Sequence, residues 1–163
     1  MRLVDRTKFL EGYAQNAARL VEPLVMELIA YGSRRAVHIV ILDPRKQYAP
    51  GVDLPVLFEG TIGEQDSKVW ERPFDEIARA KARVCWRTGM SSRTVGECAP
   101  YLYEPGDTKF PGGVVCDKLI VAVSGLEWQF DEAVAHSVIG LFWAGVRAAR
   151  EAAMLNGNQI AVC

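Results

Sequence analysis

The segment formed by residues 110–138, FPGGVVCDKLIVAVSGLEWQFDEAVAHSV, constrains the fold of this chain more than any other stretch. A Pro-Gly-Gly break opens it, and two short β-rich runs follow at about 113–116 and 119–123. Because a two-residue connection joins adjacent antiparallel strands, these runs can pair as a hairpin across Asp117 and Lys118.

A long helix is predicted directly after this hairpin. Ser124 and Gly125 end the second run, and Asp131 and Glu132 open an apolar-periodic segment that continues to about Leu155. Acidic residues suit a helix start because they satisfy free N–H groups and the helix dipole, and this is the ordinary role expected for Asp131. Glu132 lies one residue further in and can instead turn toward the junction between strand and helix.

The rest of the chain adds helices and strands in an order that indicates an α+β fold. Helices are predicted at about 7–31 and 74–88, strands at about 36–42 and 56–59, loops at 44–54 and 60–67, and a short helix after Ser91-Ser92. Pro23 lies inside the first helix and should kink it or split it in two. Since the strands come in adjacent pairs, an antiparallel sheet with helices on it is expected, in one domain over residues 1–163.

Composition narrows the class of protein. The chain has 163 residues, is 50% hydrophobic and carries a net charge of −1, so a proper core is expected and a nucleic-acid footprint is not. No apolar run approaches the ~20 residues that span a bilayer, and the first residues turn polar before a signal-peptide core could form. A cytoplasmic protein without a membrane partner is the simplest interpretation.

Cysteine and histidine usage gives little sign of a metal site. Cys85, Cys98, Cys116 and Cys163 form no CxxC pair, and His38 and His136 are the only histidines, far apart in sequence. Structural zinc sites normally show close ligand pairs, so no metal is expected and the thiols should be free and reduced.

Lys81 is the most informative single residue. It falls in the middle of the apolar stripe of the helix over 74–88, whereas the other charged residues of that helix lie off the stripe. An inward lysine is costly unless it is paired or faces a wet pocket. Two interpretations stay open: a pocket cation that holds an anionic ligand or developing negative charge, and a lysine whose ammonium extends to solvent.

The two histidines each allow two interpretations. His38 lies mid-strand, where a histidine bonded to backbone is the ordinary expectation and a heme ligand or acid–base group is the alternative. His136 shares a second helix stripe with Gly140, Trp143 and Arg147, which favours a subunit interface over a cofactor site.

Aromatic residues are frequent enough to line a pocket for a flat ligand. Core packing explains most tryptophans equally well. The aromatic residues that could line such a pocket are Trp70, Trp86, Trp128, Trp143, Tyr101, Tyr103, Phe110 and Phe130. No GxGxxG, GxxxxGK[ST] or GxSxG motif occurs, so nucleotide-binding and classical serine-hydrolase activities have no support.

Taken together, these motifs resemble a known family. The run GGVVCDKLIVAVSG followed by DEAVA is similar to the signature of the GlcG/HbpS-like family, which includes the C-terminal domain of PduO. The segment FDEIARAKARVCWRTGMSSRTV resembles the family's "IA..KA.TA" segment, with Lys81 on its lysine, and AVHIVILD resembles its first strand. The resemblance implies a profilin/PAS-like central antiparallel sheet flanked by helices, and homo-oligomers.

The resemblance also implies two functions. Some relatives bind heme, with a histidine near the first helix, where this chain has none; others are similar to hydroxylaminobenzoate lyases. We therefore expect a metal-independent and cofactor-free enzyme acting on a small aromatic carboxylate, most specifically a lyase that releases ammonia from 4-hydroxylaminobenzoate and gives protocatechuate. The alternatives are a heme-binding module, with His38 or His136 as axial ligand, and a structural oligomer with no chemistry.

Each candidate residue has an expected role in the lyase. Lys81 or Arg45 would hold the carboxylate, and Glu132 or Glu59 would protonate the departing hydroxyl or activate water. Tyr103 and Trp128 would stack on the ring, and Phe110 and Ser124 would complete the binding site.

Overall fold

The computed structural model describes residues 6–157 and consists of a four-stranded sheet with helices on both faces. The elements are α1 (Arg6–Tyr31), β1 (Ala36–Leu42), β2 (Val56–Gly63), α2 (Phe74–Thr88), α3 (Ser92–Cys98), β3 (Gly113–Cys116), β4 (Leu119–Ser124) and α4 (Trp128–Leu155), with single 3₁₀ turns at Ser67–Val69 and Pro100–Leu102. The α+β class predicted from the sequence is confirmed.

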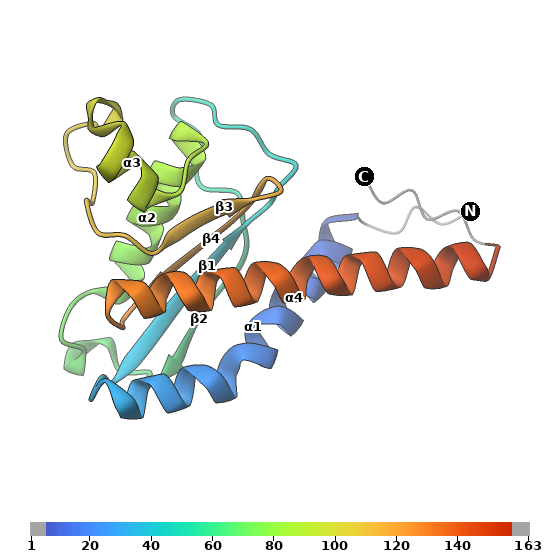
Figure 1. Cartoon of the computed structure of the whole chain (residues 1–163), viewed down its shortest axis with the longest axis horizontal. Helices are drawn as coiled ribbons and strands as arrows, with labels where there is room; N and C mark the ends of the chain where they lie inside the picture. The colour runs from blue at the N-terminus through green and yellow to red at the C-terminus, as the bar shows by residue number, and fades with distance from the viewer. Residues whose placement is uncertain (1–5, 158–163) are drawn as a thin grey trace.

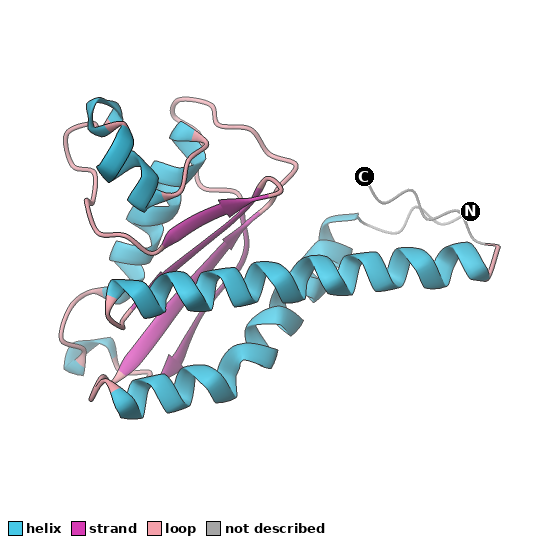
Figure 2. Ribbon diagram, in the orientation of Figure 1, coloured by secondary structure: helices cyan, strands magenta, loops and turns pink. Residues whose placement is uncertain are grey.

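The sheet is antiparallel throughout, in the order β2-β1-β4-β3 (Figure 2). β1 and β4 are the central strands, and all of their residues are buried, as their continuous apolar runs predict. The hairpin across Asp117 and Lys118 forms as expected, because β3 pairs directly with β4.

The two faces of the sheet are covered by different helices (Figure 1). Successive side chains of a strand point to opposite faces. Val37, Ile39 and Ile41 of β1 therefore pack in the core that α1 and α4 cover, whereas Val40 and Leu42 pack against α2. His38 and Ser124 share the parity of the α2 side, so that face carries the polar side chains of the central strands.

The predicted end of β2 needs correction, whereas α1 takes one of the two forms expected of it. β2 continues to Gly63 instead of ending at residue 59, because residues 60–63 pair with β1 and Ile62 enters the core. α1 is one assigned helix through Pro23, although its axis changes direction along its length (Figure 1). Pro23 removes one backbone donor, and the buried Val21 and Val25 on either side hold the helix together.

None of the helices within residues 6–157 is long and apolar enough to cross a membrane. The described cysteines, Cys85, Cys98 and Cys116, are free thiols, and only Cys85 is buried. Cys163 lies outside the described residues.

Candidate functional site

A buried ion pair lies where β4 ends and α4 begins. α2 directs Lys81 into the protein, and its Nζ donates to the carbonyl of Val123 at 2.7 Å and to Asp131 Oδ2 at 3.0 Å. The Lys81 and Asp131 side chains are only 2% and 4% exposed. The inward position predicted for Lys81 is confirmed, but its ammonium does not reach solvent. The sequence does not predict the ion-pair partner of Lys81, which is Asp131.

Asp131 is more than the helix-start acid expected from its position. Its second oxygen, Oδ1, accepts from the backbone N–H of Leu126 at 3.0 Å, so one carboxylate joins the turn after β4 to α2. Burial raises the pKa of Asp131 to about 6, and the Lys81 charge limits this rise. Burial likewise lowers the pKa of Lys81, which Asp131 opposes. Asp131 is therefore a carboxyl group that can exchange a proton near neutral pH.

Glycine at position 112 is required by this pair. Gly112 has a φ of +121°, which L side chains rarely adopt, and a Cβ there would lie 2.6 Å from Lys81 Nζ and 2.8 Å from the carbonyl oxygen of Val123. Gly113 is constrained by space alone, since a Cβ there would lie 2.6 Å from Cys85 Sγ. The Pro-Gly-Gly break is thus what allows the backbone to pass over the buried ammonium.

Glu132 faces the outer side of the same junction. Arg93 of α3 donates through Nε to both carboxylate oxygens of Glu132, at 3.0 and 3.1 Å, and also pairs with Glu97. The Glu132 side chain is 13% exposed, so it is close to the surface but not freely hydrated. Glu132 is therefore a partly exposed carboxylate beside the Lys81–Asp131 pair, and an arginine is already next to it.

Aromatic candidates lie on the chain segments that flank this junction. Trp128 begins α4 and is 40% exposed, and Phe110, two residues before Gly112, is 49% exposed. The Arg72 guanidinium lies 5.4 Å from the ring centre of Phe110. Tyr103 is half-buried on the loop after α3, with Lys109 Nζ 5.9 Å from its ring centre, and burial raises the pKa of its hydroxyl.

A second polar cluster crosses the same face of the sheet. His38 Nε2 lies 2.9 Å from Glu59 Oε1 and its Nδ1 lies 2.7 Å from Thr61 Oγ1, while Arg79 donates to both oxygens of Glu59 at 2.6 and 2.9 Å. Burial acts to raise the pKa of Glu59, but hydrogen bonds from Arg79 and His38 hold it below the usual value. An ionised carboxylate only accepts, so Nε2 of His38 carries a proton. His38 is directly opposite Ser124 in the β1–β4 ladder, which places this cluster next to the junction.

The structure separates the remaining candidates from this region. Arg45 follows β1 at the other end of the sheet, where its guanidinium holds Asp43 at 2.9 and 2.7 Å. His136 is exposed on α4 and makes no hydrogen bond or ion pair within residues 6–157. Trp143, on the stripe predicted with His136, is partly buried against the core.

Lys81, Glu132 and Ser124 therefore lie at this junction, Phe110 and Trp128 lie on the segments that flank it, and the cluster of His38 and Glu59 is next to it. Asp131, Arg93 and Arg79 were missed from the sequence. In the part of the chain that is described, no group of three or more His, Cys, Asp or Glu side chains could hold a metal ion.

Comparisons with known proteins identify the fold. No family model matches this sequence, and no curated protein matches it. Among solved structures, the chain is similar to protein ORFY from Klebsiella pneumoniae, of the DUF336 family, with 17% identity, a TM-score of 0.56, and coverage of 82% of this chain and 90% of ORFY. The Ybr137w protein gives 18% identity and a TM-score of 0.47, over 86% of this chain and 79% of that one.

The chain thus shares its α+β fold with this DUF336 protein. DUF336 is the GlcG-like family, so this similarity of fold agrees with the resemblance seen in the sequence motifs. At 17% identity the likeness is one of fold alone.

Proposed function

We propose that this protein is a metal-independent enzyme acting on a small aromatic carboxylate at the junction of β4 and α4. In its most specific form the reaction releases ammonia from 4-hydroxylaminobenzoate and gives protocatechuate. The observation that carries the proposal is a partly exposed carboxylate, Glu132, held by Arg93 and lying beside the buried Lys81–Asp131 pair.

The residues have distinct roles in this proposal. Glu132 is the catalytic acid–base group, and Arg93 orients it and offers a guanidinium that can also bind a carboxylate. Trp128 and Phe110 supply exposed rings for stacking. Lys81 is a positioning residue, because its buried ammonium holds Asp131 and the end of β4 and does not contact a ligand directly.

The reaction suits a site without a metal or redox cofactor. 4-Hydroxylaminobenzoate and one water molecule give protocatechuate and ammonia. The N–O bond, the C–N bond, one ring C–H bond and one O–H bond break, while two ring C–O bonds and two N–H bonds form. The ring loses the two electrons that nitrogen gains, so no external oxidant is needed. What the enzyme must supply is a proton for the departing hydroxyl and a base for water, which carboxyl groups provide.

The test is a product assay with a matched pair of variants. Purified protein is incubated with 4-hydroxylaminobenzoate, and ammonia and protocatechuate are quantified. We expect Glu132→Gln to lower kcat/KM by about 100-fold or more. Glu97→Gln should leave it unchanged, since Glu97 also pairs with Arg93 but is 60% exposed. Absence of ammonia above the enzyme-free rate, or equal activity of the two variants, would refute the proposal.

A second candidate function is tetrapyrrole binding, and the exposure of His136 favours it. Both ring nitrogens of His38 are already engaged with Glu59 and Thr61, so ligation through either nitrogen would break a hydrogen bond. A hemin titration should therefore show a Soret shift that His136→Ala abolishes and His38→Ala leaves. No shift with the unaltered protein would exclude this function.

A further inference from the structure

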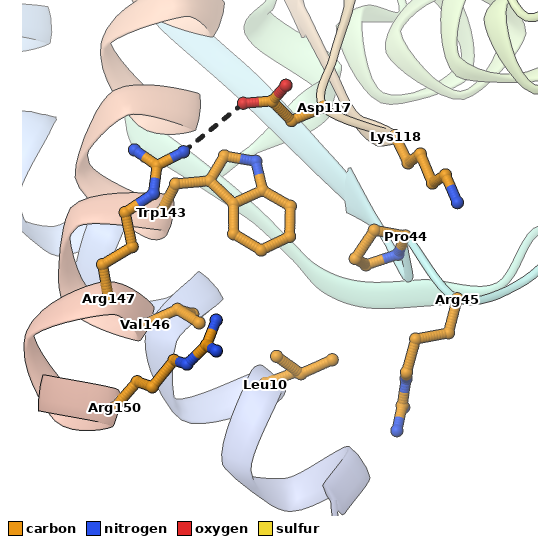
Figure 3. A pocket seen from close by; sticks show the side chains of 9 residues that line it. All are labelled: Leu10, Pro44, Arg45, Asp117, Lys118, Trp143, Val146, Arg147 and Arg150. Carbon is orange, nitrogen blue, oxygen red and sulfur yellow. Dashed lines mark hydrogen bonds and ion pairs between the residues drawn. The ribbon is translucent and has the colours of Figure 1, made fainter. Parts of the chain in front are cut away.

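A cavity of about 400 Å³ lies at the end of the sheet opposite the Lys81 junction (Figure 3). β1 runs from His38, opposite Ser124, to Leu42, opposite Ile120, so residues that follow β1 lie near the β3–β4 turn. The cavity is bounded by the start of α1, the segment after β1, this turn and the second half of α4. Its volume is within the range typical of small-molecule sites.

The cavity has an apolar surface formed by four side chains: Leu10, Pro44, Trp143 and Val146. The indole of Trp143 is the largest of them, and Figure 3 shows it at the centre, with Val146 and Leu10 below it. A flat apolar ligand can therefore pack against an aromatic face at this position.

Positive charge surrounds this apolar surface. Arg45, Lys118, Arg147 and Arg150 line the cavity, and Asp117 is the one acid among the nine lining residues. Figure 3 places Arg147 and Arg150 on one side of the indole and Lys118 and Arg45 on the other. The whole chain carries a net charge of −1, so this concentration of cations is local to the cavity.

Two of these cations are not neutralised by any residue in the range 6–157. Arg45 holds Asp43, and Arg147 makes a long contact of 3.5 Å with Asp117 in which both side chains are about two-thirds exposed. Lys118 and Arg150 make no ion pair with any residue in the range 6–157. A ligand anion would therefore meet uncompensated positive charge on both sides of the indole.

Trp143 adds an unsatisfied donor. Its Nε1 is buried and has no hydrogen-bond partner among the described residues, the one such side-chain atom in that part of the chain. An unpartnered buried N–H is unfavourable, and its partial positive charge is not compensated by an acceptor. The unpaired N–H therefore offsets part of the stability that the protein gains from the packing of Trp143.

The turn that carries Lys118 is strained. Asp117 and Lys118 have φ values of +49° and +68°, in the left-handed region that a two-residue hairpin of this kind imposes. Asparagine and glycine suit these positions, whereas lysine is unfavourable there. This turn places Lys118 at the edge of the cavity, and strained backbone of this kind is concentrated at functional sites.

From these observations we propose that the cavity binds a small organic anion with a flat apolar body, the body against Trp143 and the anionic group toward Lys118 and Arg150. None of the nine lining residues is His, Cys, Met or Tyr, so the site offers no usual axial ligand for a heme iron. The cavity is distinct from the proposed catalytic junction. Ligand binding to the cavity can therefore be tested without measuring enzyme activity.

Calorimetric titration with 2-naphthoate tests the proposal, with 2-naphthamide as its uncharged analogue and acetate as an anion without an aromatic body. We expect 2-naphthoate to bind, and both analogues to bind about tenfold more weakly or not at all. Equal affinity for naphthoate and naphthamide would overturn the anionic requirement, and no heat with naphthoate would overturn the site.

Matched variants assign the binding to this cavity. Arg150→Gln and Lys118→Gln should each raise the Kd for 2-naphthoate about five- to tenfold, since each removes one charge-assisted contact. Arg83→Gln is the control, because it removes the same charge from an exposed position on α2, across the sheet. Thermal unfolding of each variant verifies that it is folded. A change in Kd that is the same for Arg83→Gln as for the cavity variants would place binding elsewhere.

Discussion

Replacing Lys81 by methionine should destabilise the protein in a way that depends on pH. Methionine keeps the apolar stem of the lysine but removes the ammonium that contacts Asp131 and the carbonyl of Val123. Asp131 would then be a buried carboxylate with only the Leu126 N–H as its partner. Removing one member of a buried pair costs about 3–5 kcal/mol, a large part of a typical stability.

The pH dependence follows from the direction of the Asp131 pKa. Burial raises it from 3.8 to about 6 in the folded protein. The stability linked to a raised pKa is fully present below the unfolded value and is lost as pH rises through the folded value. This difference is worth about 3 kcal/mol between pH 4 and pH 7. In Lys81→Met the pKa of Asp131 should rise further, because the opposing charge is gone, so the variant should be weakest above pH 6 and recover on acidification.

Urea unfolding at about pH 5 and about pH 7.5 measures this effect as a difference between variant and unaltered protein. Adding Asp131→Asn to Lys81→Met should restore part of the loss at the higher pH, because the buried charge is removed. Arg83→Met, on the exposed side of the same helix, is the control and should change little. A loss for Lys81→Met of the same size at both pH values would refute the argument, because it would show that Asp131 does not titrate with folding.

Two further predictions concern the surroundings of this pair. Gly112→Ala should lower the free energy of unfolding by about 2–4 kcal/mol, because its Cβ would meet Lys81 Nζ and the backbone conformation is unfavourable. Gly140→Ala, with open space around it, should raise the same quantity by about 0.5–1 kcal/mol, so urea unfolding of the two variants gives opposite signs. Burial raises the pKa of Cys85 to about 12. A thiol reagent near neutral pH should therefore label Cys98 and Cys116 but not Cys85 until the protein unfolds. Peptide mass mapping distinguishes the three sites, and labelling of Cys85 in the native protein would contradict its burial.

The sequence predicts the elements of this fold well because each has a local signal. The continuous apolar runs give the two central strands, and the stripe of α2 shows that Lys81 points inward. The end of β2 was missed because Gly60 and Gly63 suggest a loop. Pairing with the buried β1 overrides that local preference, and the ring of Phe58 covers the space above Gly60.

The candidate site is less predictable because its contacts are long-range. Lys81 and Asp131 are separated by 50 residues, and Glu132 and Arg93 by 39. No spacing rule connects such residues, so Asp131 was assigned the ordinary role of an acid at a helix start. One clue was present in the sequence: an inward lysine needs a partner, and an acid in the first turn of the last helix was a candidate.

The cavity could not be predicted for the same reason. The local sequence around Arg45 suggests a substrate site, and the local sequence around Trp143 suggests a subunit interface. Neither segment alone indicates that the two residues lie together. The β1–β4 register brings the segment after β1 to the β3–β4 turn, and the second half of α4 completes the cavity. Only the strand register, and not the composition of any one segment, places Lys118 beside Trp143 and Arg45.

The buried pair can be assigned to folding or to chemistry by one more variant. Replacing a buried ion pair by apolar residues of similar volume is often neutral or stabilising, since the cost of burying two charges disappears. Lys81→Met combined with Asp131→Leu should therefore unfold at a urea concentration close to that of the unaltered protein. If this variant is stable but releases no ammonia from 4-hydroxylaminobenzoate, the pair is required for the chemistry at Glu132. If it is stable and retains the activity of the unaltered protein, the role proposed for Lys81 in positioning the site is wrong, and the pair serves only to fix α2 against α4.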